Sequence, residues 1–208
     1  MSLENLKLAS LENFFWQLLA GLHRVRRWGS YPRATDERVD QHTLKTVTLT
    51  LFVLLLERRY GRKDIDAFTV LAMALIHDWG EGSIGDVVWQ VKRDPRVKQA
   101  LQEIEGERLW EFLEGHLPDD IKQDLEILFG QLDQNKTAEG RLFAAIEFLG
   151  YLSFAIYEVK HEGRKEFVQV FRDQYQNAAN CAEEFASIRI IWEQMKTVID
   201  PYMTEQSA

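Results

Sequence analysis

The sequence has almost no cysteine: Cys181 is the only one among 208 residues. A disulfide within the chain needs two cysteines, and so does a zinc site of the Cys-x-x-Cys type, so both are excluded. A single thiol suits a reducing compartment. The first residues lack a basic stretch followed by an apolar core, so they predict no secretory signal. We therefore expect a cytoplasmic protein.

Proline is scarce as well, with four residues, and no stretch is rich in proline, glycine or serine. The sequence therefore contains no recognisable linker or low-complexity tract. Hydrophobic residues make up 46% of the chain, which is typical of a globular protein. We expect a single domain over 1–208, with its core over about residues 10–160 and C-terminal helices over about residues 164–203.

Long apolar runs and excess positive charge are also absent. The longest apolar run, Leu142–Tyr157, has 16 residues and contains Glu147, whereas a membrane span needs about 20 apolar residues. We interpret this run as a buried core helix and expect no membrane partner. The net charge of −8 argues against binding to nucleic-acid polymers or anionic membranes.

Helical periodicity is present along nearly the whole chain, and no run alternates with period two as a strand would. We therefore predict an all-α fold. The expected helices cover about residues 10–27, 39–60, 65–80, 95–115, 118–132, 138–161, 164–179 and 182–203, with a short helix or turn near 86–92. The segment LTLFVLLL, residues 49–56, is apolar on every side of its helix and is expected to be central.

Four polar residues stand at or inside apolar helices. His42 opens the 39–60 helix, the His77–Asp78 pair ends an apolar run, and Glu147 interrupts the longest one. Each alone is explained by a helix cap or an ion pair, but charged side chains are rarely buried unless they are paired or bind a metal. If these helices pack together, two imidazoles and two carboxylates form an ordinary ligand set for Mn, Fe, Co or Zn.

A glycine-containing loop with two further acids follows the His77–Asp78 pair. Glu81 comes one turn after His77, and Asp86 follows Gly85, where the backbone can bend tightly. A hydrolase needs a carboxylate near a metal-bound water to move protons, and both acids suit that task. The alternative for Asp86 is that it caps the next helix.

Arginines gather just upstream, in the string HRVRRWGSYPR. Arg24, Arg26, Arg27 and Arg33 lie within ten residues of an otherwise acidic protein, and Trp28 offers a flat face beside Arg27. Guanidinium groups match phosphate oxygens in two-point contacts. The alternative is a solvated helix end, where cations are favourable.

These residues together resemble the HD-domain metal-dependent phosphohydrolases, which have a His, then a His-Asp pair and a distal acid. The resemblance is closer to the bacterial 5′-deoxynucleotidase (YfbR-like) branch, with its Arg-Trp pair, its acid before V-x-x-H, and its HD pair followed by Glu and Gly-Asp. Here these strings read RW at 27–28, ERVDQH at 37–42 and HDWGEGSIGD at 77–86. The similarity covers about residues 10–160 and implies a compact helical bundle around one divalent cation.

The resemblance also implies metal ligands. His42, His77 and Asp78 match the family's first ligands, and the cofactor is expected to be one divalent ion: Mn, Co, Fe, Zn or Mg. The last ligand in the family is an Asp, but the matching segment AIEFLGYL has Glu147 there. Because glutamate reaches one methylene further, metal identity and substrate range depend on how this position has adapted.

The remaining roles implied by the resemblance concern catalysis and the substrate. Glu81 would serve the nucleophilic water, and Asp86, together with Asp78, would line the substrate pocket. Arg27 would orient the phosphate and Trp28 would contact the sugar. Two further candidate residues lie a few positions after the Gly-Asp pair. Trp89 is expected to reshape the nucleoside pocket, and Lys92 is expected to face the phosphate.

The expected function is therefore a metal-dependent phosphomonoesterase acting on (deoxy)nucleoside 5′-monophosphates through a metal-activated water. One alternative is a catalytically weakened HD protein that binds a nucleotide or a partner. Another is a hydrolase of a different phosphoester, since substrate choice lies in loop shapes. A homodimer is compatible with apolar residues in the last helices, such as Phe185, Ile188 and Trp192, although these also suit the protein's own core.

Overall fold

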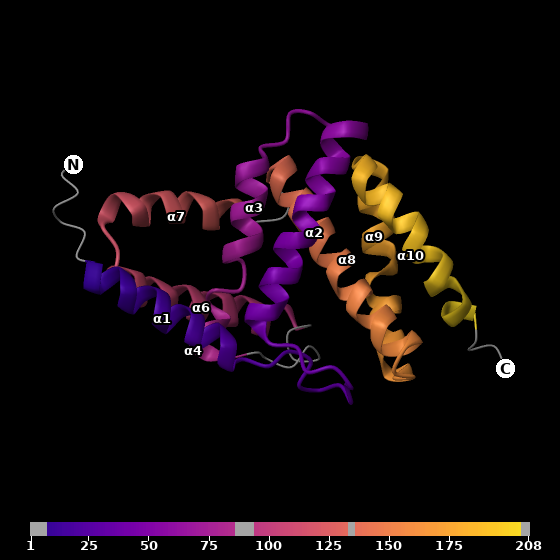
Figure 1. Ribbon diagram of the computed structural model, residues 1–208, viewed down its shortest axis with the longest axis horizontal. Helices are drawn as coiled ribbons and strands as arrows, with labels where there is room; N and C mark the ends of the chain where they lie inside the picture. The colour runs from indigo at the N-terminus through magenta and orange to yellow at the C-terminus, as the bar shows by residue number, and fades with distance from the viewer. Residues whose placement is uncertain (1–7, 86–93, 133–135, 205–208) are drawn as a thin grey trace. The chain divides into compact units, whose positions relative to one another are not determined.

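A computed structural model describes residues 8–85, 94–132 and 136–204 of the chain (Figure 1). These residues form helices joined by turns, with one isolated antiparallel bridge between Arg26 and Arg38. Across these three ranges there is no β-strand, so the all-α prediction is confirmed.

The helix boundaries follow local signals in the sequence. Helix α6 begins at Pro95, after Asp94 accepts a hydrogen bond from the Arg96 amide, and helix α8 begins after Thr137 accepts one from the Gly140 amide. The elements are α1 Leu8–Arg24, α2 Val39–Tyr60, α3 Ala67–Ile76, α4 Glu81–Ile84, α6 Pro95–Glu114, α7 Asp119–Gln131, α8 Ala138–Lys160, the 3₁₀ helix η2 Lys165–Phe167, α9 Val168–Glu184 and α10 Ala186–Thr204.

Two predicted boundaries were wrong. The third helix was expected to reach Gly80, but α3 ends at Ile76, and the chain turns there before the single-turn helix α4. The last break was expected near residue 180, but α9 continues to Glu184. The break lies at Phe185, which has an extended backbone and a fully buried ring. The expected element near 86–92 lies outside the described residues.

Contacts divide the chain into two compact units. The first comprises Met1–Ser30, Asp36–Thr43 and Ile76–Gly130. Within it, α1 packs on α4 and α4 packs on α6. The core is aliphatic and aromatic, and Phe14 stacks on Phe112 at 5.4 Å between ring centroids. Its buried members are Phe14, Leu18, Leu22, Val25, Val39, Leu109 and Leu113.

The second unit comprises Tyr31–Thr35, Leu44–Leu75 and Gln131–Ala208. Helix α8 packs on α9 and α10, and α9 packs on α10. Helix α8 is long and apolar enough to cross a membrane by length and composition, but 61% of its apolar window is buried inside the structure. Burial against α9 and α10 agrees with the prediction of a core helix. That both units form one domain stays a prediction.

Two buried carboxylates join distant segments of the second unit. Glu57 accepts hydrogen bonds from the amide of Arg62 at 2.8 Å and from the amide and hydroxyl of Ser187 at 2.8 and 2.5 Å. Glu158 accepts from the amides of Ala34 and Thr35, each at 2.8 Å. Since buried charges are costly unless hydrogen-bonded, these acids fix the helix ends and the loop that they contact.

The prediction that residues 49–56 are central was wrong. Leu51, Phe52 and Leu55 are about half exposed, whereas Val53 is fully buried. The buried face of α2 instead includes Thr46 and Thr50, and the Thr50 hydroxyl donates to the Thr46 carbonyl at 2.8 Å. A threonine hydroxyl satisfied within its own helix can be buried, so hydrophobicity alone misjudged which face is inside.

Candidate active site

Three predicted ligands lie together in the first unit. His42 is in the first turn of α2, and its amide bonds to the Arg38 carbonyl at 2.9 Å. His77 and Asp78 occupy the turn between α3 and α4, where the chain leaves an apolar helix. Residues 35 positions apart in sequence are therefore brought to one place, as the sequence predicted.

The cluster is built around one oxygen of Asp78. Its Oδ2 lies 3.2 Å from Nε2 of His77 and 3.6 Å from Nε2 of His42. The two imidazole rings are 5.3 Å apart between centroids. Arg27 donates from Nη1 to the same oxygen at 2.8 Å. All three potential ligand atoms lie within 4.8 Å of one another.

The electrostatics of the cluster favour an ionised Asp78. Burial raises the pKa of this carboxyl, but the charges of His77 and Arg27, a hydrogen bond from His77 and the charge of His42 outweigh burial. The pKa of Asp78 is therefore held far below its usual range. The carboxyl group is therefore in its anionic form near neutral pH.

This donor set suits a divalent transition metal. Two imidazole nitrogens and a carboxylate oxygen converge within a few ångströms, which matches the ligand types of catalytic Zn, Fe, Mn or Co sites. Three protein ligands leave further coordination positions for water or substrate. The chemistry of His42, His77 and Asp78 therefore fits the predicted metal.

Glu81 begins the helix that follows the metal cluster. Its side chain is buried, and its amide bonds to the carbonyl of Asp78 at 3.1 Å. Helix α4 ends at Gly85, whose φ of 89° is a conformation that side-chain-bearing residues rarely adopt. The turn thus presents Asp78 and then Glu81 within four residues.

Arg27 and Trp28 lie in a segment that pairs with the chain before α2. The Arg27 amide donates to the Glu37 carbonyl at 2.9 Å, and the Val39 amide donates to the Val25 carbonyl at 3.1 Å. Trp28 has a φ of 61°, the only positive φ outside glycine in the described ranges. A left-handed residue of this size costs about 1–3 kcal/mol, so its surroundings must hold it in place.

Glu37 is the site residue whose role sequence reasoning missed. Its side chain is 3% exposed, and its Oε2 accepts a hydrogen bond from the Trp28 indole at 3.0 Å. The same oxygen lies 3.7 Å from Nε of Arg27. The signal was available, because the acid before V-x-x-H belongs to the matched motif, but no side-chain function was attached to it.

The other predicted site residues are not part of the described cluster. Glu147 lies on α8 in the second unit, half-buried, and Tyr151 donates to it at 3.4 Å. Its role as the last ligand stays a prediction. Asp86, Trp89 and Lys92 lie outside the described residues, so their roles also stay predictions.

The chain is similar to known proteins over most of its length. A protein-family model described as "5′-deoxynucleotidase YfbR-like" matches residues 14–196. The chain is 22% identical over 156 residues to a 5′-deoxynucleotidase of Yersinia pestis strain Pestoides F, covering 74% of this chain and 78% of the relative. A 5′-deoxynucleotidase of Yersinia pseudotuberculosis serotype O:1b matches with the same identity and coverage.

Solved structures show the same fold. An HD-domain phosphohydrolase from Listeria innocua matches with a TM-score of 0.77 and 20% identity, over 94% of this chain and 97% of that one. A predicted metal-dependent phosphohydrolase from Magnetospirillum magnetotacticum matches with a TM-score of 0.64 and 18% identity, over 97% and 95%. Because the family match spans most of its length, the chain belongs to the YfbR-like 5′-deoxynucleotidase family and is a phosphomonoester hydrolase with the HD-domain fold.

Proposed function

We propose that this protein hydrolyses deoxynucleoside 5′-monophosphates to the nucleoside and phosphate in the cytoplasm, using one divalent cation. The observation that carries the proposal is the convergence of His42, His77 and Asp78, with Arg27 bonded to Asp78. The curated relatives are named 5′-deoxynucleotidases, which supports the substrate class.

His42, His77 and Asp78 would hold the cation, which supplies a polarised phosphate oxygen and an acidified water when bound. The depressed pKa of Asp78 keeps this ligand in its anionic form. Neutral imidazoles are the ligands that divalent transition metals take from histidine.

Arg27 contributes charge beside the ligands. Its side chain is 10% exposed, and its guanidinium lies 2.8 Å from Asp78. A permanent positive charge therefore lies beside the cluster. Negative charge grows on the equatorial oxygens during phosphoryl transfer, and a guanidinium stabilises it there.

Glu81 is the proposed proton acceptor. It is buried and follows Asp78 by three residues. A carboxylate held near the attacking water removes its proton as the bond to phosphorus forms, and the leaving 5′-oxygen then requires a proton. Asp86 is proposed to share this proton traffic, with Trp89 and Lys92 in substrate contact.

The test is phosphate release by metal-stripped protein supplied in turn with Mn, Co, Fe, Zn and Mg. The panel contains ribo- and deoxyribonucleoside 5′-monophosphates with each base. We expect metal-dependent release that favours the deoxy series. His77→Ala should abolish metal uptake, whereas His161→Ala, at an exposed histidine on the far end of α8, should leave it intact.

Release without added metal, or full metal content in His77→Ala, would contradict the ligand assignment. Metal uptake with no phosphate release from any nucleotide would favour the alternative of a catalytically weakened HD protein that binds a nucleotide or a partner. The sequence motivates that alternative because Glu147 stands where the family has the shorter Asp. Release from a cyclic or triphosphate substrate alone would identify a different phosphoester.

A further inference from the structure

Glu37 contacts two residues that the family resemblance assigns to the substrate, Trp28 and Arg27. Through Oε2 it accepts the Trp28 indole hydrogen at 3.0 Å and lies 3.7 Å from Nε of Arg27. Its backbone carbonyl accepts the Arg27 amide at 2.9 Å. One buried residue therefore holds the side chain of Trp28 and both the backbone and side chain of Arg27.

The contact matters because Trp28 does not hold its own conformation. Its φ of 61° lies in the left-handed region, which a large side chain adopts only when its surroundings enforce it. The indole hydrogen bond fixes the ring relative to Glu37, and the backbone bond between Arg27 and Glu37 fixes the preceding residue. Both bonds end on Glu37.

Arg27 extends this chain of contacts to the metal ligands. Its Nη1 donates to Asp78 at 2.8 Å, while its Nε faces Glu37. A guanidinium held at two of its nitrogens has little rotational freedom left, so its charge stays at a defined place. Groups that orient active-site residues in this way change affinity or activity by about 10- to 100-fold when they are removed.

We propose that Glu37 is a positioning residue that sets how this enzyme discriminates nucleotides from simpler phosphate esters. The proposal rests on the proposed function, together with the roles that the family resemblance implies: Trp28 toward the sugar and Arg27 toward the phosphate. Loss of Glu37 releases the indole, which only a nucleotide contacts, and loosens Arg27, which every phosphate ester contacts. The kcat/KM for nucleotides should therefore fall more than the kcat/KM for aryl phosphates.

The experiment compares kcat and KM for deoxyadenosine 5′-monophosphate and 4-nitrophenyl phosphate. In Glu37→Ala, we expect the ratio of the two kcat/KM values to fall about 10-fold, mainly through KM for the nucleotide, with metal affinity unchanged. Trp28→Phe, which removes the indole N–H, should lower the ratio similarly and add little in the double variant. Asp36→Asn is the matched control, since this neighbouring acid is about half exposed and pairs with Arg26 at the surface.

An unchanged ratio in Glu37→Ala, or an equal fall in Asp36→Asn, would overturn the positioning role. If the wild type hydrolyses neither substrate, the proposed function fails instead. The role of Glu37 is then read from calorimetric binding of the same nucleotide, which should weaken in Glu37→Ala and not in Asp36→Asn. Equal binding by all three proteins would refute it.

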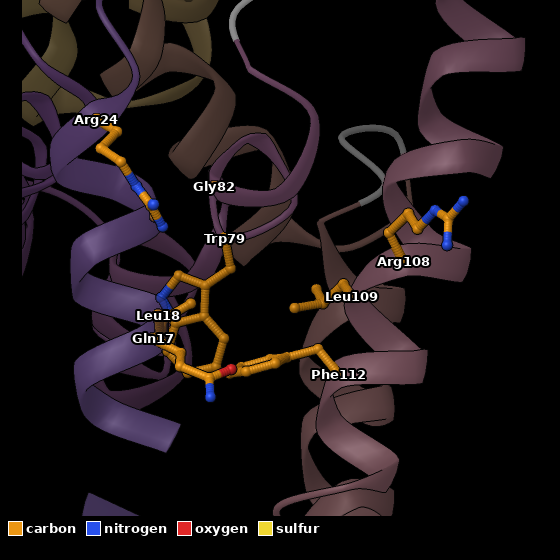
Figure 2. Close-up of a pocket in the computed structure, with 9 residues that line it drawn as sticks. Gln17, Leu18, Arg24, Trp79, Gly82, Arg108, Leu109 and Phe112 are labelled. Carbon is orange, nitrogen blue, oxygen red and sulfur yellow. The ribbon is translucent and has the colours of Figure 1, made fainter. Parts of the chain in front are cut away.

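A separate observation in the first unit is a pocket of about 330 Å³ between α1, α4 and α6, a size that fits a small organic ligand (Figure 2). Trp79, Leu109 and Phe112 line its apolar part. Arg24 and Arg108 stand on opposite sides, on α1 and α6 (Figure 2). Nε of Arg24 donates to the Ala20 carbonyl at 2.9 Å, which fixes the base of its guanidinium.

The pocket touches the helix that carries Glu81. Gly82 lines it, one residue from Glu81, and rests directly on Gly21 of α1. A Cβ at Gly21 would stand 2.9 Å from the Gly82 carbonyl oxygen, so α1 and α4 meet with no room to spare. A ligand between α1 and α6 therefore contacts the backbone next to the proposed proton acceptor.

The geometry points to a second, regulatory binding site for an anion with a flat aromatic ring, such as a nucleotide. The ring would lie on Trp79 and Phe112, and the anionic group on Arg24, in a chain whose net charge of −8 otherwise repels anions. Regulation through Glu81 rests on the proposed function, but binding to the pocket does not.

Calorimetry with deoxyadenosine 5′-monophosphate and metal-stripped protein tests the site. We expect binding to persist in Arg27→Ala and to weaken about 10-fold or more in Arg24→Gln, because a charge-assisted contact is lost. Arg26→Gln is the control, two residues along and absent from the pocket lining. Loss of all binding in Arg27→Ala, or wild-type binding by Arg24→Gln, would refute the second site.

Discussion

The Trp28 indole donates a hydrogen bond to the buried carboxylate of Glu37, at 3.0 Å from Nε1 to Oε2. The donor belongs to a residue in the left-handed region, and the acceptor is nine residues further along the chain. The bond therefore closes the loop between α1 and α2, beside the Arg27 that bonds to Asp78.

This bond predicts a stability effect that is separate from activity. Glu37→Ala removes a buried acceptor and leaves the indole and Arg27 without it, so the free energy of unfolding should fall by about 1–3 kcal/mol. Urea unfolding followed by circular dichroism measures it. Asp36→Ala, at the exposed neighbour, should change stability by no more than about 0.5 kcal/mol. Equal losses in both variants would contradict a specific contribution of the Glu37 contacts.

Glu81→Gln should separate metal binding from turnover. The amide keeps the size of the side chain but cannot accept the proton from water, so kcat should fall about 100- to 10,000-fold. Metal content, measured by mass spectrometry, should match that of the wild type because His42, His77 and Asp78 remain. Turnover within a few-fold of the wild type would remove Glu81 from the mechanism.

Glu147→Ala tests the departure from the family's ligand pattern. If Glu147 is the last ligand, metal affinity should fall at least about 10-fold, whereas Glu147→Asp should restore the family's own side chain and keep the metal. Glu162→Ala, at an exposed acid just beyond α8, is the control. Equal metal affinity in Glu147→Ala and Glu162→Ala would show that the site is complete without Glu147.

Gly21→Ala should act on the active site from the opposite side of α4. The added Cβ would stand 2.9 Å from the Gly82 carbonyl, so either α1 or the helix that carries Glu81 must shift. We expect a fall in kcat with metal affinity unchanged. Gly106→Ala on α6 has open space around its Cβ and should be neutral or slightly stabilising, because alanine is the better helix former. Wild-type kcat in Gly21→Ala would show that α1 yields instead.

Glu184 should contribute to acid sensitivity in the second unit. A hydrogen bond from Arg141 lowers its pKa, against burial, and the charges of Arg141 and Arg62 add to the effect. A lowered pKa means that the stabilisation is present at neutral pH and is lost as pH falls through the folded-state pKa. Since the pair is more than a third exposed, the difference between wild type and Glu184→Gln should stay below about 1 kcal/mol. Unfolding curves at pH 7 and pH 3 measure it, and an equal difference at both would contradict the prediction.

Much of the fold and the ligand cluster could be predicted from the sequence. His42 and His77–Asp78 stood out because polar residues interrupted apolar helices, and the structure brings them within 4.8 Å. The sequence also predicted that the second helix covers residues 39–60, and α2 is Val39–Tyr60 in the structure.

The errors have a common physical cause, which is that burial depends on partners distant in sequence. Thr50 is buried and Phe52 is exposed, although hydrophobicity suggests the reverse. α9 ends at Phe185, whose ring is fully buried, and no local signal in the sequence marks this end. Glu37 belongs to the matched motif, but its contacts with Trp28 and Arg27 depend on how the chain folds back before α2.

The buried carboxylate of Glu57 has a consequence for how the chain is made. Its partner Ser187 lies 130 residues further along, so during synthesis the end of α2 emerges long before the residue that completes its hydrogen bonds. Until α10 arrives, the second unit carries an incompletely paired buried charge, which disfavours its closed form. We expect docking of α10 to be a late step in folding, and chains cut before Ser187 to be protease-sensitive, although the proposed metal ligands lie earlier in the sequence.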